Sequence, residues 1–318
     1  MGANSSSSSE IPMLDKQILK KQFTDLYSTN RVDLSYKKIE VIDVGTFSGV
    51  INLEVIDLHT NKLQQLNEDV FRGLLNLKII DLHENHILQL HKDTFKDLVY
   101  LEGLNLHENK IQRIHKDTFQ GLVNLQYLRL QNNDITHIDK DTFKDLVNLV
   151  GLDLHYNRIA QIDKDTFSRL KNLQRIYLSG NFIQELHKDT FQGLLFLRRI
   201  ELHNNKIEKL DKDIFRGLDS LRKILLSSNK IEEIHPQIFA GLTNLQKVHL
   251  QNNKLESIHK LTFKGLCKLE EVRMHTNCFK EDQVLDLVLE KSVQFFSFRP
   301  GQSDWDLAND IDLTKVNN

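Results

Sequence analysis

"LQYLRLQNNDI" occupies residues 125–135, and "LEGLNLHENKI" occupies residues 101–111, 24 residues earlier. In both stretches Leu stands at places 1, 4 and 6, Asn at place 9 and Ile at place 11. The tetrapeptide "KDTF" keeps the same 24-residue spacing, at 92–95, 116–119, 140–143, 164–167 and 188–191. A fixed spacing of this length predicts an array of supersecondary units, each stacked on its neighbours.

The period extends well beyond these stretches. Phe recurs ten times from Phe47 to Phe263, and Asn recurs ten times from Asn61 to Asn277, without an insertion in either series. The unit resembles the 24-residue typical subtype of leucine-rich repeat, found in Slit, Toll-like receptors and small leucine-rich proteoglycans, over residues 29–280. The resemblance implies an α/β fold: a solenoid, or horseshoe, of about eleven turns with a parallel concave sheet and helical N- and C-terminal caps.

Each repeated residue type also has a physical explanation of its own. Apolar residues at places 4 and 6 alternate with polar neighbours, which predicts one short parallel strand per repeat. The Asn side chain has a donor and an acceptor for backbone groups that would otherwise be buried unpaired. Phe95 and its equivalents are expected to stack on the convex side, and Asp93 and Thr94 to start a short helical segment there.

The repeat boundaries predict the domain organisation. Residues 1–10 are expected to form a disordered leader, 11–28 an N-terminal cap helix, 29–280 the repeat array, and 281–318 a C-terminal cap and tail. In the tail, "DWDLANDIDL" (304–313) alternates acids with apolar residues. Packing of this segment on the cap is the favoured interpretation, and a partner-binding motif is the alternative.

Composition and motifs argue against several classes of function. The net charge of −2 disfavours nucleic-acid binding by charge alone, and no apolar run reaches the ~18 residues of a membrane helix. The sequence contains no phosphate-binding glycine loop, nucleophile elbow, HExxH or CxxC motif. We therefore expect no enzymatic activity, no cofactor and no metal site.

The cysteines and the N-terminus indicate in which cellular compartment the protein is expected. Cys267 and Cys278 flank the last predicted strand, too far apart for a disulfide, so two free thiols in a reducing, cytoplasmic setting are expected. The start "MGANSS" fits N-myristoylation of Gly2, with Ser6 at the Ser/Thr place; an unmodified leader is the alternative. One acyl chain gives only reversible membrane contact. A gene model lacking its signal peptide, and hence an extracellular protein, is the third possibility.

Binding residues are expected at the strand positions two, four and six residues before each Asn, which line the concave face. Six residues before the Asn, four consecutive repeats carry a basic side chain, whereas the early repeats carry acids four residues before it, such as Asp57. Aromatic residues, which with Arg dominate binding hot spots, lie in the middle repeats. The predicted partner-binding residues are Tyr127, Arg129, Tyr156, Arg175, Tyr177, Arg199, Lys223, Leu225 and Lys247. The alternative is a solvated face whose bases pair with neighbouring acids such as Glu201.

A histidine row is the one metal-like feature of the predicted face. His59, His83 and His107 stand two residues before consecutive Asn residues, with Asp57 and Asp81 close by. Imidazole and carboxylate are ordinary metal ligands, and imidazole also titrates near neutral pH. Because duplication of a repeat copies exposed residues too, and corner positions show a similar His series, copying is the favoured explanation.

Together these features predict a non-enzymatic protein-binding scaffold whose concave face holds a protein or peptide, acidic in character, and no nucleic acid. Two alternatives remain at this stage. The first is a membrane-associated adaptor anchored by myristoylated Gly2. The second is an extracellular adhesion or receptor ectodomain.

Overall fold

The computed structural model of the chain describes residues 12–279. Gly2, the predicted leader and the predicted C-terminal cap and tail lie outside the described residues. The chain divides into two compact units, Met1–Asn148 and Leu149–Asn318, and each is described by itself.

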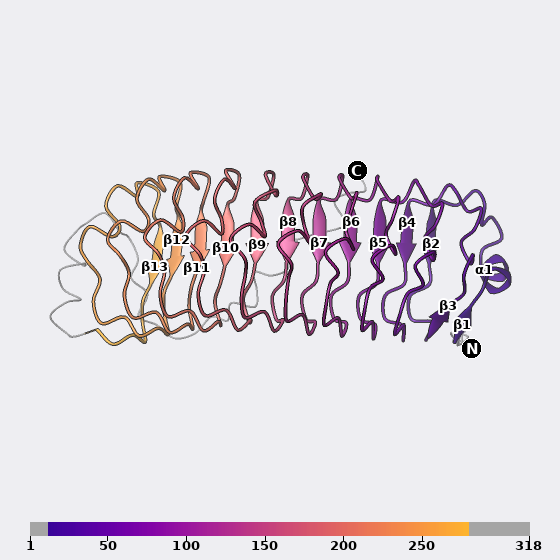
Figure 1. Cartoon of the computed structure of the whole chain (residues 1–318), viewed down its shortest axis with the longest axis horizontal. Helices are drawn as coiled ribbons and strands as arrows, with labels where there is room; N and C mark the ends of the chain where they lie inside the picture. Colours follow the sequence, from indigo (N-terminus) through magenta and orange to yellow (C-terminus); the bar gives the residue numbers. More distant parts are fainter. Residues whose placement is uncertain (1–11, 280–318) are drawn as a thin grey trace, which may run out of the picture. The chain divides into compact units, whose positions relative to one another are not determined.

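The first unit is built on a parallel sheet that follows the order of the chain (Figure 1). Each strand pairs with the next exactly one repeat later, as Val55 does with Ile79. The strands are β2 (Arg31–Asp33), β4 (Val55–Asp57), β5 (Ile79–Asp81), β6 (Gly103–Asn105) and β7 (Tyr127–Arg129).

The second unit repeats the same arrangement. Its strands are β8 (Gly151–Asp153), β9 (Arg175–Tyr177), β10 (Arg199–Glu201), β11 (Lys223–Leu225), β12 (Lys247–His249) and β13 (Glu271–Arg273), all parallel and in chain order. With five strands of the repeat sheet in the first unit and six in the second, the predicted leucine-rich repeat solenoid with one strand per turn is confirmed.

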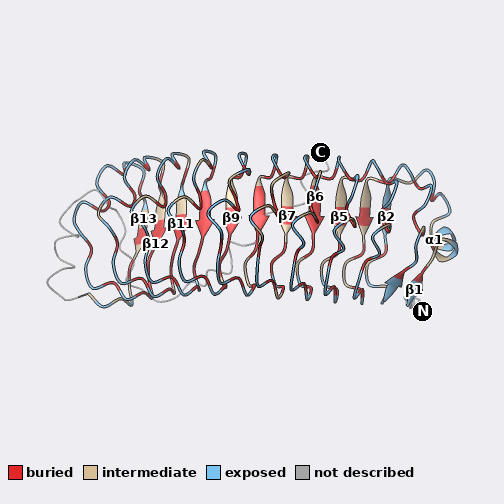
Figure 2. Cartoon of the chain, viewed as in Figure 1, coloured by how far each residue is buried: buried red, intermediate tan, exposed pale blue. Residues whose placement is uncertain are grey.

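The core of each unit consists of the repeated apolar positions, so buried and exposed residues alternate at the same places in every repeat (Figure 2). The repeated Phe rings stack on one another, with ring centroids 6.1 Å apart for Phe71 and Phe95 and 6.2 Å apart for Phe167 and Phe191. The predicted stacking of the Phe series is therefore confirmed, and burial of each large ring is a main source of stability.

The Asn series forms the predicted structural ladder. The Oδ1 atom of Asn205 accepts from the Ile183 N–H at 3.1 Å, and its Nδ2 atom donates to the carbonyls of Leu178 at 2.9 Å and Leu202 at 3.0 Å. These partners come from its own repeat and from the repeat before. One buried amide thereby pairs the Ile183 N–H and shares two carbonyls with its neighbours in the ladder, since Asn181 also donates to Leu178 and Asn229 to Leu202.

The return segments are turns rather than the predicted short helices. In the KDTF corner of the first unit, the Thr94 N–H donates to the His91 carbonyl at 3.2 Å, and the Lys96 N–H to the Asp93 carbonyl at 3.0 Å. Each of these bonds joins an N–H to the carbonyl three residues earlier and closes a single turn. The corners turn the chain back within a few residues, which leaves no room for an α-helical turn to propagate.

The N-terminal cap contains a helix shorter than the predicted span 11–28. Helix α1 covers Lys16–Gln22 and is the only helix within residues 12–279. Asp15 caps it by accepting the Ile18 N–H at 2.8 Å. Before the helix, β1 (Met13–Leu14) pairs in parallel with β3 (Val41–Ile42), so these residues are committed to a strand.

Two further predictions concern membrane-spanning helices and the state of the cysteines. Within residues 12–279 no helix has the length and apolarity needed to cross a membrane. Cys267 and Cys278 are both exposed and both free thiols.

Candidate functional site

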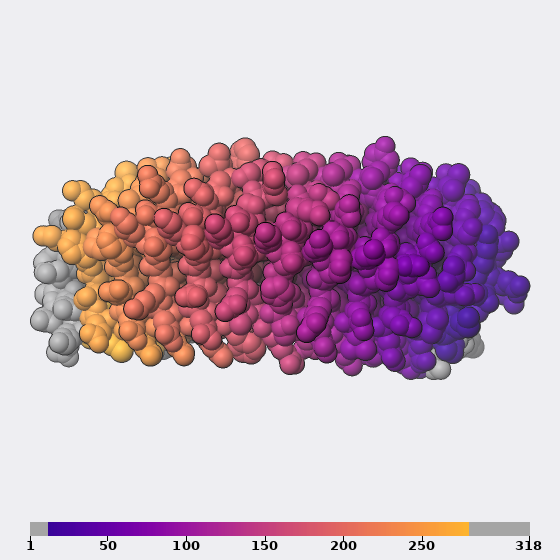
Figure 3. Space-filling view, in the orientation of Figure 1, coloured from indigo at the N-terminus to yellow at the C-terminus, as the bar shows by residue number. Residues whose placement is uncertain are grey.

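We call the outer face the side of each sheet opposite the leucine core, formed by the residues six, four and two places before each ladder Asn. The parallel register places equivalent residues directly beside one another, such as Arg175 beside Arg199. In the space-filling view the repeats appear as adjacent bands of side chains that follow the chain order within each unit (Figure 3).

The outer face of the first unit begins with acids. Asp33, Asp57 and Asp81 are register neighbours on β2, β4 and β5. Burial raises the pKa of the Asp57 carboxyl, and the negative charges of Asp81 and Asp33 add to that shift. The Arg31 guanidinium lies 3.3 Å from the Asp57 carboxylate and partly offsets the charge.

The His row of the first unit is a stack of rings. The ring centroids of His59 and His83, and of His83 and His107, are 4.4 Å apart, with interplanar angles of 12° and 6°. The lone pairs of such rings lie in parallel planes, so one metal ion cannot lie in the planes of two rings at once. This geometry disfavours a chelate made by the row.

His83 and Asp81 form a close pair within the stack, with Nδ1 2.5 Å from Oδ1. Burial alone would lower the pKa of His83, but the hydrogen bond and charge of Asp81 outweigh it and raise that pKa. Burial alone would likewise raise the pKa of Asp81, and the interaction with His83 instead lowers it. The pair is therefore an ion pair at mildly acidic pH.

Tyr127 and Arg129, the two predicted binding residues of the first unit, lie half-buried on β7. Tyr127 is the register neighbour of Gly103, which has no side chain to shield the ring on that side. Tyr127 and Arg129 thus present an aromatic ring and a guanidinium together on β7, the last strand of the first unit.

The predicted basic row lies on the outer face of the second unit, but its members differ in exposure. Arg175, Arg199, Lys223 and Lys247 are consecutive register neighbours on β9 to β12. Arg199, one of the predicted partner-binding residues, is instead buried, with Nε 2.5 Å from Oε1 of Glu201. Lys247 pairs with Glu271 at 2.8 Å. The half-exposed bases of the row are Arg175, Lys223 and Lys247.

A buried column lies beside the basic row, four residues before each Asn. It runs from β8 to β12 through Asp153, Tyr177, Glu201, Leu225 and His249, all buried, whereas in the first unit only Asn105 of the equivalent residues is buried. Tyr177, Leu225 and His249 each expose only 3% of their surface. Burial also raises the pKa of the Glu201 carboxyl, against the opposing charge of Arg199.

Tyr177 is the central aromatic residue of this column. The Arg199 guanidinium lies over its ring at 5.7 Å from the centroid, a cation–π contact. Its hydroxyl is buried and has no hydrogen-bond partner within residues 12–279. Burial raises the pKa of Tyr177 to about 12, so the hydroxyl stays protonated and can donate a hydrogen bond.

Tyr156 lies apart from the column, one residue before Asn157, with a left-handed backbone conformation at φ 50°. Its ring packs against Gly180, where a Cβ atom would come within 2.4 Å of it. Sequence reasoning missed the role of Gly180. The signal was present, because no other repeat has a glycine directly before its ladder Asn.

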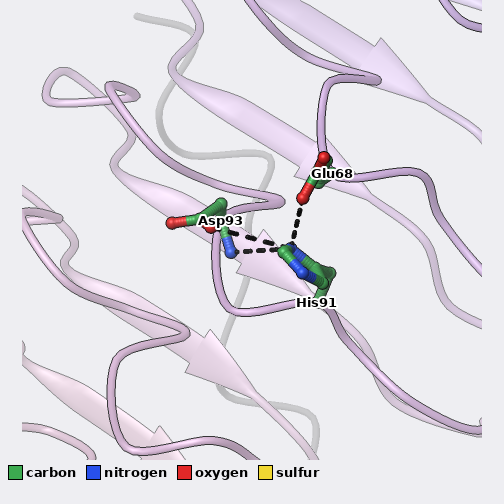
Figure 4. A group of neighbouring side chains, drawn as sticks. All are labelled: Glu68, His91 and Asp93. Carbon is green, nitrogen blue, oxygen red and sulfur yellow. Dashed lines mark hydrogen bonds and ion pairs between the residues drawn. The ribbon is translucent and has the colours of Figure 1, made fainter.

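A three-residue cluster lies in a corner of the first unit (Figure 4). His91 Nδ1 is 3.2 Å from Glu68 Oε2 and 3.9 Å from Asp93 Oδ2, and one ligand atom from each residue falls within 4.8 Å of the others. The positions equivalent to Glu68 in the next repeats are Lys92 and Lys116, so the departure at Glu68 creates the group. The three side chains could hold a divalent cation, but their exposure favours plain ion pairing.

An exposed apolar row follows the return segments of the first unit, and sequence reasoning did not identify it. Its members are between 40% and 59% exposed and occupy one place per repeat: Ile51, Leu75, Val99, Val123 and Val147. Asn side chains of the next repeat donate to the carbonyls of Ile51, Val99 and Val123, as Asn76 Nδ2 does to Ile51 at 2.9 Å.

The family comparison matches most of the chain. The leucine rich repeat family profile aligns with residues 28–87, 75–135, 124–183, 172–231 and 219–279. No curated protein matches the sequence significantly.

Solved structures share the fold at low sequence identity. A chain of the Toll–Spätzle complex of Drosophila has a TM-score of 0.72 at 20% identity, over 83% of this chain and 39% of that one. A chain of the octameric complex of Latrophilin 3, Unc5D and FLRT2 gives 0.75 at 21% identity, over 88% and 86%. A chain of the TLR13–ssRNA13 complex gives 0.67 at 22%, over 93% and 50%. The chain thus spans half or less of the Toll and TLR13 chains.

Proposed function

Because this chain belongs to the leucine-rich repeat family, we propose that it is a non-enzymatic scaffold that binds a protein or peptide on the outer faces of its sheets. The observation that carries the proposal is the outer face of the second unit. There a buried column with Tyr177 and Leu225 lies beside Arg175 and Lys223. A desolvated aromatic residue beside flexible bases is the usual composition of a binding hot spot.

The partner is expected to be acidic. The outer face of the second unit carries five basic side chains against three acidic ones: Arg175, Arg199, Lys223, Lys247 and Arg273 against Asp153, Glu201 and Glu271. Complementary charge would set the register and the association rate more than the affinity.

Solved chains of the same fold support a protein partner. The Toll chain occurs with Spätzle, and the FLRT2 complex contains Latrophilin 3 and Unc5D. The TLR13 chain occurs with single-stranded RNA, but the net charge of −2 here favours protein over nucleic acid.

Within this proposal the predicted binding residues take different roles. In the second unit Arg175, Lys223 and Lys247 attract the partner, the buried Tyr177 and Leu225 form the floor on which these bases lie, and buried Arg199 orients the Tyr177 ring. Tyr156, which packs against Gly180 beside the column, supports the edge of this surface. In the first unit Tyr127 and Arg129 form a smaller contact surface on β7.

The cellular placement is part of the same proposal. Two exposed free thiols, Cys267 and Cys278, support a reducing compartment such as the cytoplasm. An acylated Gly2 would add reversible membrane contact, and an extracellular role remains the alternative. Mass spectrometry of the N-terminal peptide from native cells separates these three.

A double variant and a single control variant test the binding surface. The Arg175→Glu/Lys223→Glu double variant should lose association rate with a partner recovered from native cells, and the loss should shrink as salt rises. Lys209→Glu, an exposed lysine outside the outer face of the same unit, should bind as the original does. If the double variant binds as fast as Lys209→Glu at low salt, the outer face is not the binding surface.

A further inference from the structure

The corner cluster of Glu68, His91 and Asp93 in the first unit brings three electron-pair donors to one point (Figure 4). The Nδ1 atom of His91 accepts the Asp93 N–H at 3.3 Å, and it lies 3.2 Å from Oε2 of Glu68 and 3.9 Å from Oδ2 of Asp93. An Nδ1 atom that accepts an N–H carries no proton to give to either carboxylate. Two negative groups therefore face a lone pair, and a cation placed among them is attracted by all three.

The separations suit a divalent transition-metal ion. Zinc binds imidazole nitrogen and carboxylate oxygen at about 2.0–2.2 Å, so neighbouring ligand atoms of a tetrahedral site lie roughly 3.4 Å apart. The distances of 3.2 and 3.9 Å from Nδ1 to the two carboxylates lie on either side of that value. The three side chains are between 41% and 53% exposed, so they can rotate into place and water can complete the coordination.

The other charged groups of the corner leave the cluster accessible. Lys92 lies with Nζ 3.9 Å from Oδ2 of Asp93, but its side chain is 53% exposed and can turn into solvent. Arg72 already pairs with Asp69 at 3.5 Å. An open hollow of about 330 Å³ beside Glu68 and Asp93 is lined by two further acids and two bases, namely Asp69, Asp97, Arg72 and Lys96. These four charges balance, so the carboxylates of the cluster decide its attraction for a cation.

Two other corner histidines have a similar surrounding but lack the third ligand. Their Nδ1 atoms also accept the N–H two residues later and lie near the carboxylate of the same Asp, at 3.7 Å for His115 with Asp117 and at 3.5 Å for His187 with Asp189. At the place of Glu68 these corners have Lys92 and Lys164, and an ammonium group repels a cation. The chain thus contains two internal controls for the cluster.

We propose that Glu68, His91 and Asp93 form a binding site for a divalent transition-metal cation such as Zn²⁺. The protein ligands are Nδ1 of the imidazole and one oxygen of each carboxylate, and the metal replaces the long hydrogen bond at Nδ1. Because Glu68 belongs to the repeat before His91, the cation joins the return segments of two consecutive repeats. It therefore stabilises them in proportion to its concentration, independently of any partner on the outer faces.

Labelling of the full chain with diethyl pyrocarbonate tests the site one histidine at a time. The reagent acylates an unprotonated ring nitrogen, and when a metal occupies Nδ1 the ring proton is on Nε2, so a metal-bound histidine is not labelled. At neutral pH, ZnCl₂ should reduce the labelling of His91 several-fold, as measured by peptide mass spectrometry. His115 and His187 in the same sample should label as before. A chelator should restore the labelling of His91, and CaCl₂ should not reduce it, because Ca²⁺ prefers oxygen ligands.

Three variants separate a metal site from a general effect of charge. Glu68→Lys introduces the residue type of the neighbouring corners and should abolish the protection of His91. Glu108→Lys makes the same charge change at an exposed position outside the corner and should retain the protection. Lys164→Glu supplies the missing carboxylate in the second unit and should make the labelling of His187 sensitive to zinc. Circular dichroism should show that all three variants fold.

Four results would overturn the proposal. The first is a His91 that zinc protects no more than it protects His115, and the second is a protection of His91 that survives Glu68→Lys. The third is equal protection by CaCl₂ and ZnCl₂, which would contradict the class of cation. The fourth is a His187 that stays insensitive to zinc in Lys164→Glu, because the carboxylate would then not be the group that creates the site.

Discussion

At the scale of the residue, the Thr of the KDTF corner shows how repetition copies a group that has no bonding role. The Thr hydroxyl is buried without a hydrogen bond in six repeats: Thr94, Thr118, Thr142, Thr166, Thr190 and Thr262. In the first repeat it does have partners, because Thr46 donates to the carbonyls of Asp43 at 2.7 Å and Leu14 at 3.1 Å. Val70, Ile214 and Ile238 fill the same place elsewhere.

This difference predicts opposite responses to one substitution within the first unit. Thr118→Val should leave the melting temperature unchanged or raise it, because it removes an unsatisfied buried hydroxyl worth ~1 kcal/mol. Thr46→Val should lower it, because the variant loses the hydrogen bonds of the hydroxyl to the Asp43 and Leu14 carbonyls. Thermal unfolding followed by circular dichroism tests both, and an equal decrease in the two variants would contradict the argument.

The Asn ladder makes a second prediction at this scale. Asn205→Leu should destabilise the protein by ~1–3 kcal/mol, because the buried Ile183 N–H loses its partner and the Leu178 and Leu202 carbonyls each lose one of two Asn donors. Asn244→Leu is the control: its amide makes a bond of 2.8 Å to the Asp219 carbonyl in an exposed setting, where water can replace it. Urea unfolding of both variants provides the comparison, and similar stability would argue against the ladder.

The pair of His83 and Asp81 predicts a pH dependence. The raised pKa of His83 gives stability that is complete below its unfolded value of about 6.5 and is lost as pH rises through the folded value. The lowered pKa of Asp81 gives stability present above 3.8 and lost as pH falls through its folded value. The stability difference between the original chain and His83→Gln should therefore be largest near pH 5–6 and decline toward pH 8.

The control for this pH dependence is the same substitution made without the acid. In the Asp81→Asn background, His83→Gln should show a much flatter profile of unfolding free energy against pH. A profile that is unchanged by Asp81→Asn would mean that the pair does not control the titration.

At the scale of the element, the strands were predictable and the loops around them less so. Strand positions follow from alternation and from the 24-residue period, both of which are local properties of the sequence. The turns in place of short helices, and the shortened α1, depend on how tightly the chain must reverse. The burial of Arg199 depends on its ion pair with Glu201 and on the neighbouring strands. Neither contribution can be seen by comparing equivalent positions of the repeats in the sequence.

The strand exit at Gly180 gives the prediction for this scale. Gly180→Ala should be strongly destabilising, because φ is +65° and the new Cβ would lie 2.4 Å from the Tyr156 ring. Gly217 also has a positive φ, +77°, but a Cβ atom added there would have no other atom within 4 Å. Gly217→Ala should therefore lose only the ~1 kcal/mol of stability that the left-handed backbone conformation costs.

Removing the ring provides the second half of that test. The Tyr156→Ala/Gly180→Ala double variant should recover the part of the loss that comes from the clash, as a double-mutant cycle measures it. Equal losses for Gly180→Ala and Gly217→Ala would show that the ring does not limit the position.

At the scale of the whole molecule, the near-neutral chain carries its charges unevenly. The first unit has consecutive Asp neighbours on its sheet, and the second has the basic row with Arg175 and Lys223. The family and the fold could be predicted from the sequence because every repeat has the same sequence pattern and the same local structure. The site could not be predicted to the same degree, because it depends on the few residues that differ between repeats.

The central claim is that the outer face of the second unit is a binding surface, and site-specific photo-crosslinking in native cells tests it most directly. A photo-crosslinking amino acid is placed at position 223 on the outer face and, in a separate variant, at position 209 outside it. Mass spectrometry then maps the peptide joined at each position. The account predicts adducts at position 223 with one recurrent acidic partner segment, and none of these at position 209. Adducts that form equally at both positions, or only at position 209, would contradict it.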